Sequence, residues 1–471
     1  MINLFSFHLP SIDFRMKYFS LFIFLLGSVQ LFAQPEATMY TLSGVPQHVN
    51  YNPAFVPNYK FVLSIGPGSV HGHYSNSSFA YSDLAVRRGD SLVADLVKFN
   101  GALNKKNYIT TAGDVEAFRL GIQLSKRLYF NWTVGTKVFA RQMIPQDLTS
   151  LFINGTSSFV NSSASFSPQL EATSYLESAF GASYKVNDKI TVGGRVKILR
   201  GIVNASTENS ELTLALADDY SMTLTGDVNA RTSGIQNADN GDVKDYLKNK
   251  GLAIDLGATL KLTEKLTVGA SLLDVGAINW KNDTYAYTLD PSVATYTFAG
   301  VDLQRIIDGD EDYFDAEMDS LESKFELQEG ATGGYRTPLP GKMYFNASYK
   351  IKKQITFGAL LFMEKFQGRF HPGLSASVHK EFWRIAGVSV SYSAINKGFG
   401  NLGAGFNLNL TPFQFYVVGD NLLRMPLSYL ANGSYEKFAS NVRYFNVRAG
   451  MNFVFGRDRS HEKKAYNQRK K

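Results

Sequence analysis

Residues 181–199 read GASYKVNDKITVGGRVKIL, which is two short alternating segments joined by a polar turn. The pattern returns as GATLKLTEKLTVGASLL at 257–273 and as NASYKIKKQITFGALLF at 346–362. Looser copies are GIQLSKRLYFNWTVGTKVF, SASVHKEFWRIAGVSVSYS and AGFNLNLTPFQFYVVGDNL, which begin at Gly121, Ser375 and Ala404. Their turns are rich in Asn, Asp, Lys, Thr and Pro, which tolerate tight turns. The repeat therefore predicts six β-hairpins, or twelve strands.

Within these segments, apolar and polar residues alternate strictly. Leu252, Ile254 and Leu256 share one face of their strand, and Ala253 and Asp255 share the other. A period of two with one wholly apolar face is typical of a half-buried sheet. The pattern alone fits either a membrane barrel or a soluble β-sandwich.

The lengths of the connections favour the barrel. Turns inside the repeats are short, whereas about 30 residues follow Arg141, about 50 follow Arg200 and over 60 follow Asp274. Outer-membrane barrels have short periplasmic turns and longer external loops. A first strand from Tyr59 and a last strand ending at Phe455 complete the set. We therefore predict an all-β fold, a single closed antiparallel transmembrane β-barrel of about 14 strands over residues 58–456.

The first 33 residues read as an export signal. Met16-Lys17 precedes an apolar stretch from Tyr18 to Phe32, and Ala33 stands before the expected cut at Gln34. A positive residue, a short apolar core and a small residue at the cut are typical of a secretory signal peptide, and translation could start at Met16. A single membrane anchor is the alternative, but the apolar core is short for one.

Composition narrows the class of protein further. Charged residues are 19% of the 471, and the chain has no cysteine, which excludes disulfides, thiolate metal sites and cysteine nucleophiles. The net charge of +7 is concentrated in the last fifteen residues, 457–471, which hold seven basic and two acidic residues. We interpret 457–471 as a basic periplasmic tail and expect no nucleic-acid partner, because the barrel itself is nearly neutral.

Three stretches carry a resemblance to a known family. They are SGVPQHVNYNPAFVPNYKF at 43–61, YRTPLPGKMYFNASYKI at 335–351 and the closing strand that ends on Phe455. Together they resemble an uncharacterised outer-membrane barrel family of the Bacteroidetes, which is distantly similar to long-chain fatty-acid transporter barrels and to type IX secretion barrel proteins. The resemblance covers essentially the whole mature chain and implies a place in the cell outer membrane.

In the fatty-acid transporters, the segment before the first strand folds into the lumen. The resemblance therefore implies a plug at residues 34–57, with Asn52, Pro53 and Ala54 as its motif. A short periplasmic leader is the alternative. Pro53 and Pro57 restrict the backbone in both cases, because each removes an N–H and constrains the residue before it.

Two clusters could hold a metal, but neither is complete. Asp308–Asp312 has the oxygen spacing of a calcium loop, yet Tyr313 stands where the loop needs glycine, and the surrounding acidic segment 301–329 reads as an external, partly helical loop. His71 and His73 share one face of a strand without an evident third ligand. We expect no catalytic residue, no metal and no cofactor, and therefore no enzyme.

The polar faces of the predicted strands give a candidate lumen lining of mixed charge. We expect passive uptake of a hydrophobic or amphipathic small molecule, with outer-membrane lipid around the barrel. The alternative is a non-enzymatic scaffold or accessory partner of a secretion or surface-assembly system, with another envelope protein as its partner. The residues predicted to face the lumen are Arg195, Lys197, Asp255, Asn346, Arg448 and Asn452.

Overall fold

The computed structural model describes residues 37–88, 91–236, 248–300, 313–352, 354–366, 369–383, 385–395, 398–421 and 443–457. Fourteen antiparallel strands pair in succession, and the last pairs with the first, so the sheet closes on itself. The structure confirms the predicted closed barrel. Its strands are β1 (Tyr59–Asn76), β4 (Lys106–Gln123), β5 (Leu128–Pro145), β7 (Gln169–Lys185), β8 (Ile190–Leu216), β10 (Asn249–Lys261), β11 (Leu266–Trp280), β16 (Gly341–Lys352), β17 (Ile355–Phe366), β18 (Arg369–Phe382), β19 (Ala386–Ile395), β20 (Gly398–Leu410), β21 (Phe413–Asp420) and β22 (Tyr444–Arg457).

The six repeats of the sequence are the six hairpins of the barrel. Each repeat spans one pair, and no turn within a pair is longer than four residues. Because consecutive strands run in opposite directions, these turns all lie at one end, which we call the short-turn end. The opposite end, with the longer connections, is the long-loop end.

The faces of the barrel wall are inverted relative to a soluble protein. On β10, Leu252 and Leu256 point outward and are 58% and 52% exposed, whereas Asp255 between them is fully buried. Large apolar side chains are exposed in the same alternating way on β7, β8, β16, β19 and β21. An apolar outer surface around a polar interior is the arrangement that lipid requires of a spanning barrel.

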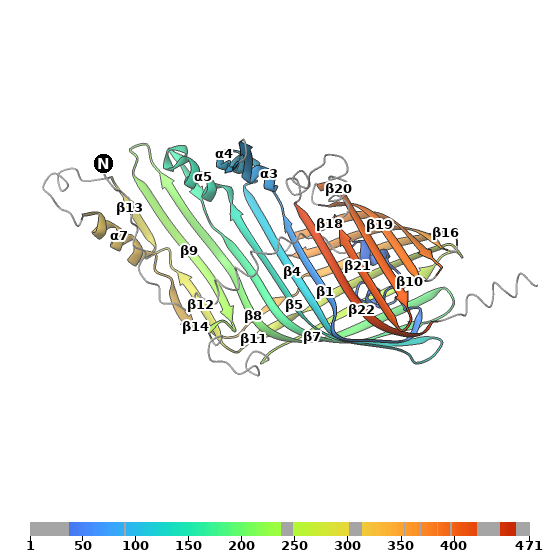
Figure 1. Cartoon of the computed structure of the whole chain (residues 1–471). Helices are drawn as coiled ribbons and strands as arrows, with labels where there is room; N and C mark the ends of the chain where they lie inside the picture. The colour runs from blue at the N-terminus through green and yellow to red at the C-terminus, as the bar shows by residue number, and fades with distance from the viewer. Residues whose placement is uncertain are drawn as a thin grey trace, which may run out of the picture.

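Strand β8 is 27 residues long and continues beyond the barrel. Its pairing with β10 ends at Gly201 of β8, after which β8 pairs with β9 (Met222–Ser233) and with β6 (Ser162–Ser165). In this extension, β12 (Thr284–Leu289) and β13 (Thr295–Phe298) pair with β9, and β14 (Gln328–Ala331) pairs with β12. Strand β15 (Tyr335–Pro338) pairs with β11. Figure 1 shows β9, β12, β13 and β14 standing beyond the barrel strands.

This extension differs from the sequence prediction, which placed only a long loop after Arg200. Ser, Thr and Asn recur on both faces of 204–213, so the apolar alternation that reveals a strand is missing there. Strand β1 starts at Tyr59, as predicted, and ends at Asn76.

The helices are short. They are α2 (Ala37–Thr41), η1 (Pro46–Asn50), α3 (Tyr81–Leu84), α4 (Leu96–Ala102), α5 (Gln146–Asn154), η2 (Thr156–Phe159) and α7 (Tyr313–Lys324), and β2 (Ala85–Arg88) pairs with β3 (Ser91–Ala94). Within the described ranges, no helix is both long enough and apolar enough to cross a membrane. Helix α7 lies in the acidic segment predicted to be partly helical. The signal peptide (1–33), the calcium-like residues 308–312 and the basic tail from 458 onward lie outside the described residues.

Candidate functional site

Residues 37–57, which we call the N-terminal segment, lie inside the barrel. Hydrogen bonds join the segment to the inner wall on several sides. The backbone N–H of Thr38 donates to Asp420 of β21 at 3.2 Å, and Nε2 of Gln47 donates to Asn452 of β22 at 2.8 Å. From the β7 side, the hydroxyl of Ser183 donates to the carbonyl of Pro53 at 2.6 Å. Anchors on strands all round the wall place this segment in the lumen near the short-turn end.

An apolar cluster holds the same segment on its other side. The ring of Tyr40 stacks on Tyr344 of β16 at 5.2 Å between centroids and meets Phe55 edge-on at 5.4 Å. Aromatic pairs at these distances add to the stabilisation that burial provides. The buried members of the cluster are Ala37, Met39, Tyr40, Leu42, Val45 and Tyr51 from the segment with Leu273, Tyr344, Leu360, Phe362, Tyr416 and Val418 from the wall.

Glycines on the inner wall make room for the segment. A Cβ at Gly193 would lie 2.1 Å from the carbonyl oxygen of Pro53, and one at Gly257 would lie 2.1 Å from Oδ1 of Asn52. At Gly403 it would lie 2.1 Å from the Thr38 hydroxyl. These approaches are far below contact distance, so only glycine fits there. Gly193 and Gly257 belong to the hairpin repeats, and their places on the polar face were a signal that the sequence analysis did not use.

The predicted motif sits at the end of the segment. Nδ2 of Asn52 donates to the carbonyls of Ala258 and Ala270 at 3.4 and 3.3 Å, on β10 and β11. Its Oδ1 accepts from the N–H of Ala54 at 2.9 Å, which closes a local turn around Pro53. The motif thus ties the segment to two wall strands immediately before the chain enters β1.

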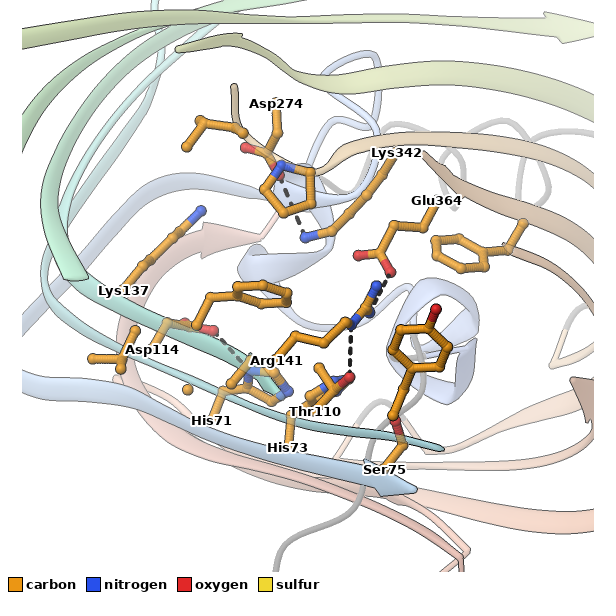
Figure 2. A pocket seen from close by; sticks show the side chains of 18 of the residues that line it. His71, His73, Ser75, Thr110, Asp114, Lys137, Arg141, Asp274, Lys342 and Glu364 are labelled. Carbon is orange, nitrogen blue, oxygen red and sulfur yellow. Dashed lines mark hydrogen bonds and ion pairs between the residues drawn. The ribbon is translucent and has the colours of Figure 1, made fainter. Parts of the chain in front are cut away.

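A cavity of about 1890 Å³ lies on the long-loop side of the segment. Asn50 and Tyr51 of the segment line it together with wall residues from most of the strands. Figure 2 shows charged side chains pointing into one shared space, among them Lys137, Arg141 and Glu364. Phe139, Leu339 and Phe362 are among the apolar residues of the lining. The cavity therefore offers both charged and apolar surface to a solute.

Lys197 is the centre of an ionic network in the cavity wall. Its Nζ lies 2.7 Å from Asp255, 2.5 Å from Asp274 and 3.9 Å from Glu177. Lys137 and Lys342 add further cations at 2.9 Å from Glu177 and 3.4 Å from Asp274. Lys197 itself is 2% exposed, so the carboxylates around it compensate a charge that has left water.

A second cluster lies on β1, β4 and β22, and its Asp114 is the cross-strand neighbour of Lys137 on β5. Asp114 accepts two hydrogen bonds from Arg448, at 2.9 and 2.7 Å, and one from Nδ1 of His71 at 2.8 Å. Two residues along β4, Glu116 pairs with Arg119 at 2.6 Å and accepts from Gln47 of the segment at 3.1 Å. Cavity-lining acids are thus bonded to the groups that hold the segment.

The His71 and His73 pair does not build a metal centre. His71 is engaged by Asp114 and Asn446, and among the described residues no group of three or more His, Cys, Asp or Glu is placed to hold an ion. The two histidine rings are 6.1 Å apart and tilted by 54°. Both line the cavity.

The residues predicted to face the lumen have side chains on the inner face of the wall. Arg195, Lys197, Asp255, Arg448 and Asn452 are at most 5% exposed, and Oδ1 of Asn346 accepts from the hydroxyl of Tyr40 at 3.0 Å. They fall into separate groups: Arg195, Lys197 and Asp255 join the Lys197 network, Arg448 binds Asp114, and Asn346 and Asn452 contact the segment. The sequence analysis missed Asp114, Glu116, Lys137, Glu177, Asp274 and Lys342.

Several solved structures have a similar outline. The toluene transporter TbuX of Ralstonia pickettii gives a TM-score of 0.43 at 10% identity, covering 88% of this chain and 94% of TbuX. A FadL homologue of Pseudomonas aeruginosa gives 0.40 at 10% identity, covering 91% and 100%. The Pseudomonas putida toluene transporter TodX gives 0.40 at 10% identity, covering 90% and 98%. At these scores the likeness is distant and carries no conclusion about function.

Sequence comparison gives the family. No curated protein matches the chain. The model of a family of unknown function, DUF5723, matches residues 53–420, which is most of the chain and nearly all of the barrel up to β21. The chain belongs to the DUF5723 family.

Proposed function

We propose that this protein is an outer-membrane channel for passive uptake of a small amphipathic or hydrophobic molecule. One observation carries the proposal: a barrel with an apolar outer surface encloses a large cavity, and the floor of that cavity is the N-terminal segment. The cavity lies on the long-loop side, which in bacterial outer-membrane barrels faces outward. A solute would enter there and stop at the segment.

The lining favours an amphipathic solute over a purely apolar one. Aromatic side chains such as Phe139 and Phe362 accommodate a hydrocarbon portion. Lys137 and Lys342 keep about a third of their side-chain surface exposed, so their ammonium groups remain available to a polar head. Small-molecule sites are usually lined by apolar side chains with only a few polar groups. The lining of this cavity holds more polar groups than such a site.

In this proposal, residues 34–57 act as a plug. The described part, 37–57, is held by side-chain hydrogen bonds and by an apolar cluster, not by strand pairing. Because these contacts are local, in this proposal the segment shifts while the strand pairing of the wall stays intact. Passage requires this shift.

Substitution of a wall glycine tests both the plug and the uptake. Gly193→Ala places a methyl group against the carbonyl of Pro53, so we expect the segment to be displaced while the outward lipid-facing wall is unchanged. Gly330→Ala is the matched control, because nothing lies within 4 Å of a Cβ at Gly330. The probe is octyl sulfate, a permanently ionised amphiphile that crosses lipid slowly.

We expect proteoliposomes with the wild-type protein to take up octyl sulfate faster than protein-free liposomes, and Gly193→Ala to exceed wild type several-fold. Gly330→Ala should match wild type. Uptake by the wild-type protein and by Gly193→Ala that is indistinguishable from protein-free liposomes would contradict the proposal.

The alternative role, as a non-enzymatic scaffold in a secretion or surface-assembly system, draws on the extension of the sheet. Strands β9, β12, β13 and β14 form a platform outside the barrel, and the four residues of β14 are exposed. Cross-linking from cysteines placed on β14 in native membranes tests this role. Recovery of a defined envelope protein would favour it, and absence of any cross-link together with octyl sulfate uptake would favour the channel.

A further inference from the structure

One ion pair in the cavity joins opposite walls of the barrel. Nη2 of Arg141, on β5, lies 3.6 Å from Oε2 of Glu364, on β17. Strands β7, β8, β10, β11 and β16 lie between β5 and β17 in one direction around the sheet, and seven strands lie between them in the other. Figure 2 shows the two side chains reaching toward each other, with their ion pair as a dashed line. By contrast, Lys137 and Glu177 form a pair between the neighbouring strands β5 and β7.

The Arg141–Glu364 pair divides the cavity into two parts. Arg141 lies directly opposite Thr110 of β4, and residues on both sides of this level line the cavity. The part toward the long-loop end, which we call the outer part, includes Ala102 and Lys106. The part that reaches down to the N-terminal segment, which we call the inner part, includes Ala112. A solute that enters from the long-loop end therefore meets the pair before it reaches the inner part.

Contacts on its own side of the barrel hold the Arg141 guanidinium in this position. Its Nε donates to the Thr110 hydroxyl at 2.8 Å, and its central carbon lies 5.5 Å from the centroid of the Phe139 ring. The Arg141 side chain is 11% exposed and that of Glu364 is 19% exposed, so the carboxylate is the partner that a solute reaches more easily. Arg141 can therefore stay in place while the carboxylate of Glu364 leaves.

An oxyanion can replace that carboxylate, because guanidinium N–H groups bind the oxygens of carboxylates, sulfates and phosphates alike. A cationic or apolar solute offers no such replacement, and it would leave a largely buried guanidinium without its carboxylate, which is costly. The displaced Glu364 has a second cation beside it. Lys342 stands directly opposite on β16, with a side chain that is 35% exposed, and cross-strand neighbours are within reach of each other.

We propose that Arg141 and Glu364 form a charge-selective bar across the cavity, which an oxyanion opens by replacing the Glu364 carboxylate at Arg141. The bar determines which solute reaches the inner part, and the N-terminal segment lies beyond it. Lys137, four residues before Arg141 and about 13 Å along β5, offers the next ammonium in the inner part. The inference rests on the proposed function and deepens it, because it assigns an oxyanionic head to the solute.

Thiol labelling tests the bar without a transport assay. The chain has no cysteine, so Ala112→Cys in the inner part and Ala102→Cys in the outer part each give one thiol that lines the cavity. The probes are two methanethiosulfonate reagents, one with an anionic sulfonatoethyl group and one with a cationic trimethylammonioethyl group, added to intact cells that produce the protein. The rate at Ala102→Cys, before the bar, normalises each reagent. We expect the normalised rate at Ala112→Cys to be several-fold higher for the anionic reagent.

Variants in the Ala112→Cys background separate the bar from a general effect of charge. Glu364→Gln breaks the bar, so we expect both reagents to react faster. If the charges acted only through their field, loss of a negative charge would slow the cationic reagent. Arg141→Gln should remove the preference for the anionic reagent. Lys106→Gln, which removes a cation of the outer part, is the control and should leave the ratio of the two rates unchanged.

Two results would overturn the bar. One is equal normalised rates of the two reagents at Ala112→Cys, and the other is a cationic reagent that reacts more slowly in Glu364→Gln. The outcome is distinguishable from that of the channel. Preference for the anionic reagent without octyl sulfate uptake would keep the bar and reject the channel, and octyl sulfate uptake without this preference would keep the channel and reject the bar.

Discussion

At the scale of single residues, buried charge is the dominant feature of the lumen. Lys197 compensates Asp255, Asp274 and Glu177, all within 4 Å of its ammonium. Removing one partner of a buried ionic group leaves the others uncompensated, which costs about 3–5 kcal/mol. The network therefore stabilises the wall only as a complete set.

We expect Lys197→Met to lower the free energy of unfolding by about 3–5 kcal/mol. Lys185→Met is the control, since Lys185 pairs with Asp188 at the short-turn end, where the Asp188 side chain is 98% exposed and such a pair is worth about 0–1 kcal/mol. Urea titration in detergent, followed by heat-modifiable migration on gels, measures both. Equal midpoints for the two variants would refute a structural role for the network.

His48 makes the seating of the N-terminal segment depend on pH on the acid side. Burial lowers its pKa to about 4, while its ring stacks on Phe55 at 3.9 Å and bonds the carbonyl of Tyr40. A released segment would return His48 to about 6.5. Between these values the released state binds more protons, so the contribution of His48 to seating is complete above pH 6.5 and is lost as pH falls toward 4.

We therefore expect a spin label at Ser43→Cys, an exposed position of the segment, to become mobile below about pH 5. His48→Gln, which cannot take up the proton, should remove this change. An acid transition that persists unchanged in His48→Gln would assign it to another group.

At the scale of elements, strand alternation made most of the wall predictable. Arg195, Lys197 and Asp255 were assigned to the lumen because apolar neighbours flank each of them on β8 and β10. Asp274 was not assigned to the lumen, because strict alternation places it on the same outward face as Leu272. The register between β10 and β11 shifts between Ile254 and Leu256, and Asp274 has a positive φ of 59°. This bulge turns the Asp274 side chain inward, and the alternation of the sequence does not predict the bulge.

The N-terminal segment was less predictable than the wall. Its location followed from resemblance, whereas its seat depends on contacts with strands hundreds of residues away, such as Thr38 with Asp420. Glu116 and Asp114 were missed for the same reason. Their side chains meet partners from other elements only because β4, β1 and β22 are successive strands of the closed sheet. Local sequence patterns do not report which distant strands meet.

The alternation also predicts the response of the outer face to charge. Leu256 points outward on β10, so we expect Leu256→Lys to lower stability in a bilayer by about 2–4 kcal/mol. Tyr220→Lys is the control, because Tyr220 is 69% exposed between β8 and β9, outside the barrel wall. Urea unfolding in lipid vesicles measures the difference. A neutral Leu256→Lys would mean that this face meets water.

At the scale of the whole molecule, closure determines the chemistry. A closed sheet removes the free edges that lipid cannot satisfy, and it encloses charges that would be unstable on the outer face. β1 pairs with both β4 and β22, and residues 37–57, which precede it, are bonded to the inner wall of this closed sheet. Closure thus encloses the segment, the cavity above it and the ionic clusters at its edges in one lumen.

The measurement that bears most directly on this account is accessibility of spin labels along β10 in a bilayer. We expect the outward positions to be reached by dissolved oxygen and shielded from a water-soluble nickel reagent, with a period of two residues against the inward positions. Uniform access of the nickel reagent to both sets would contradict a lipid-facing barrel. The outward positions are Leu252, Ile254, Leu256, Ala258 and Leu260, and the inward ones are Ala253 and Thr259.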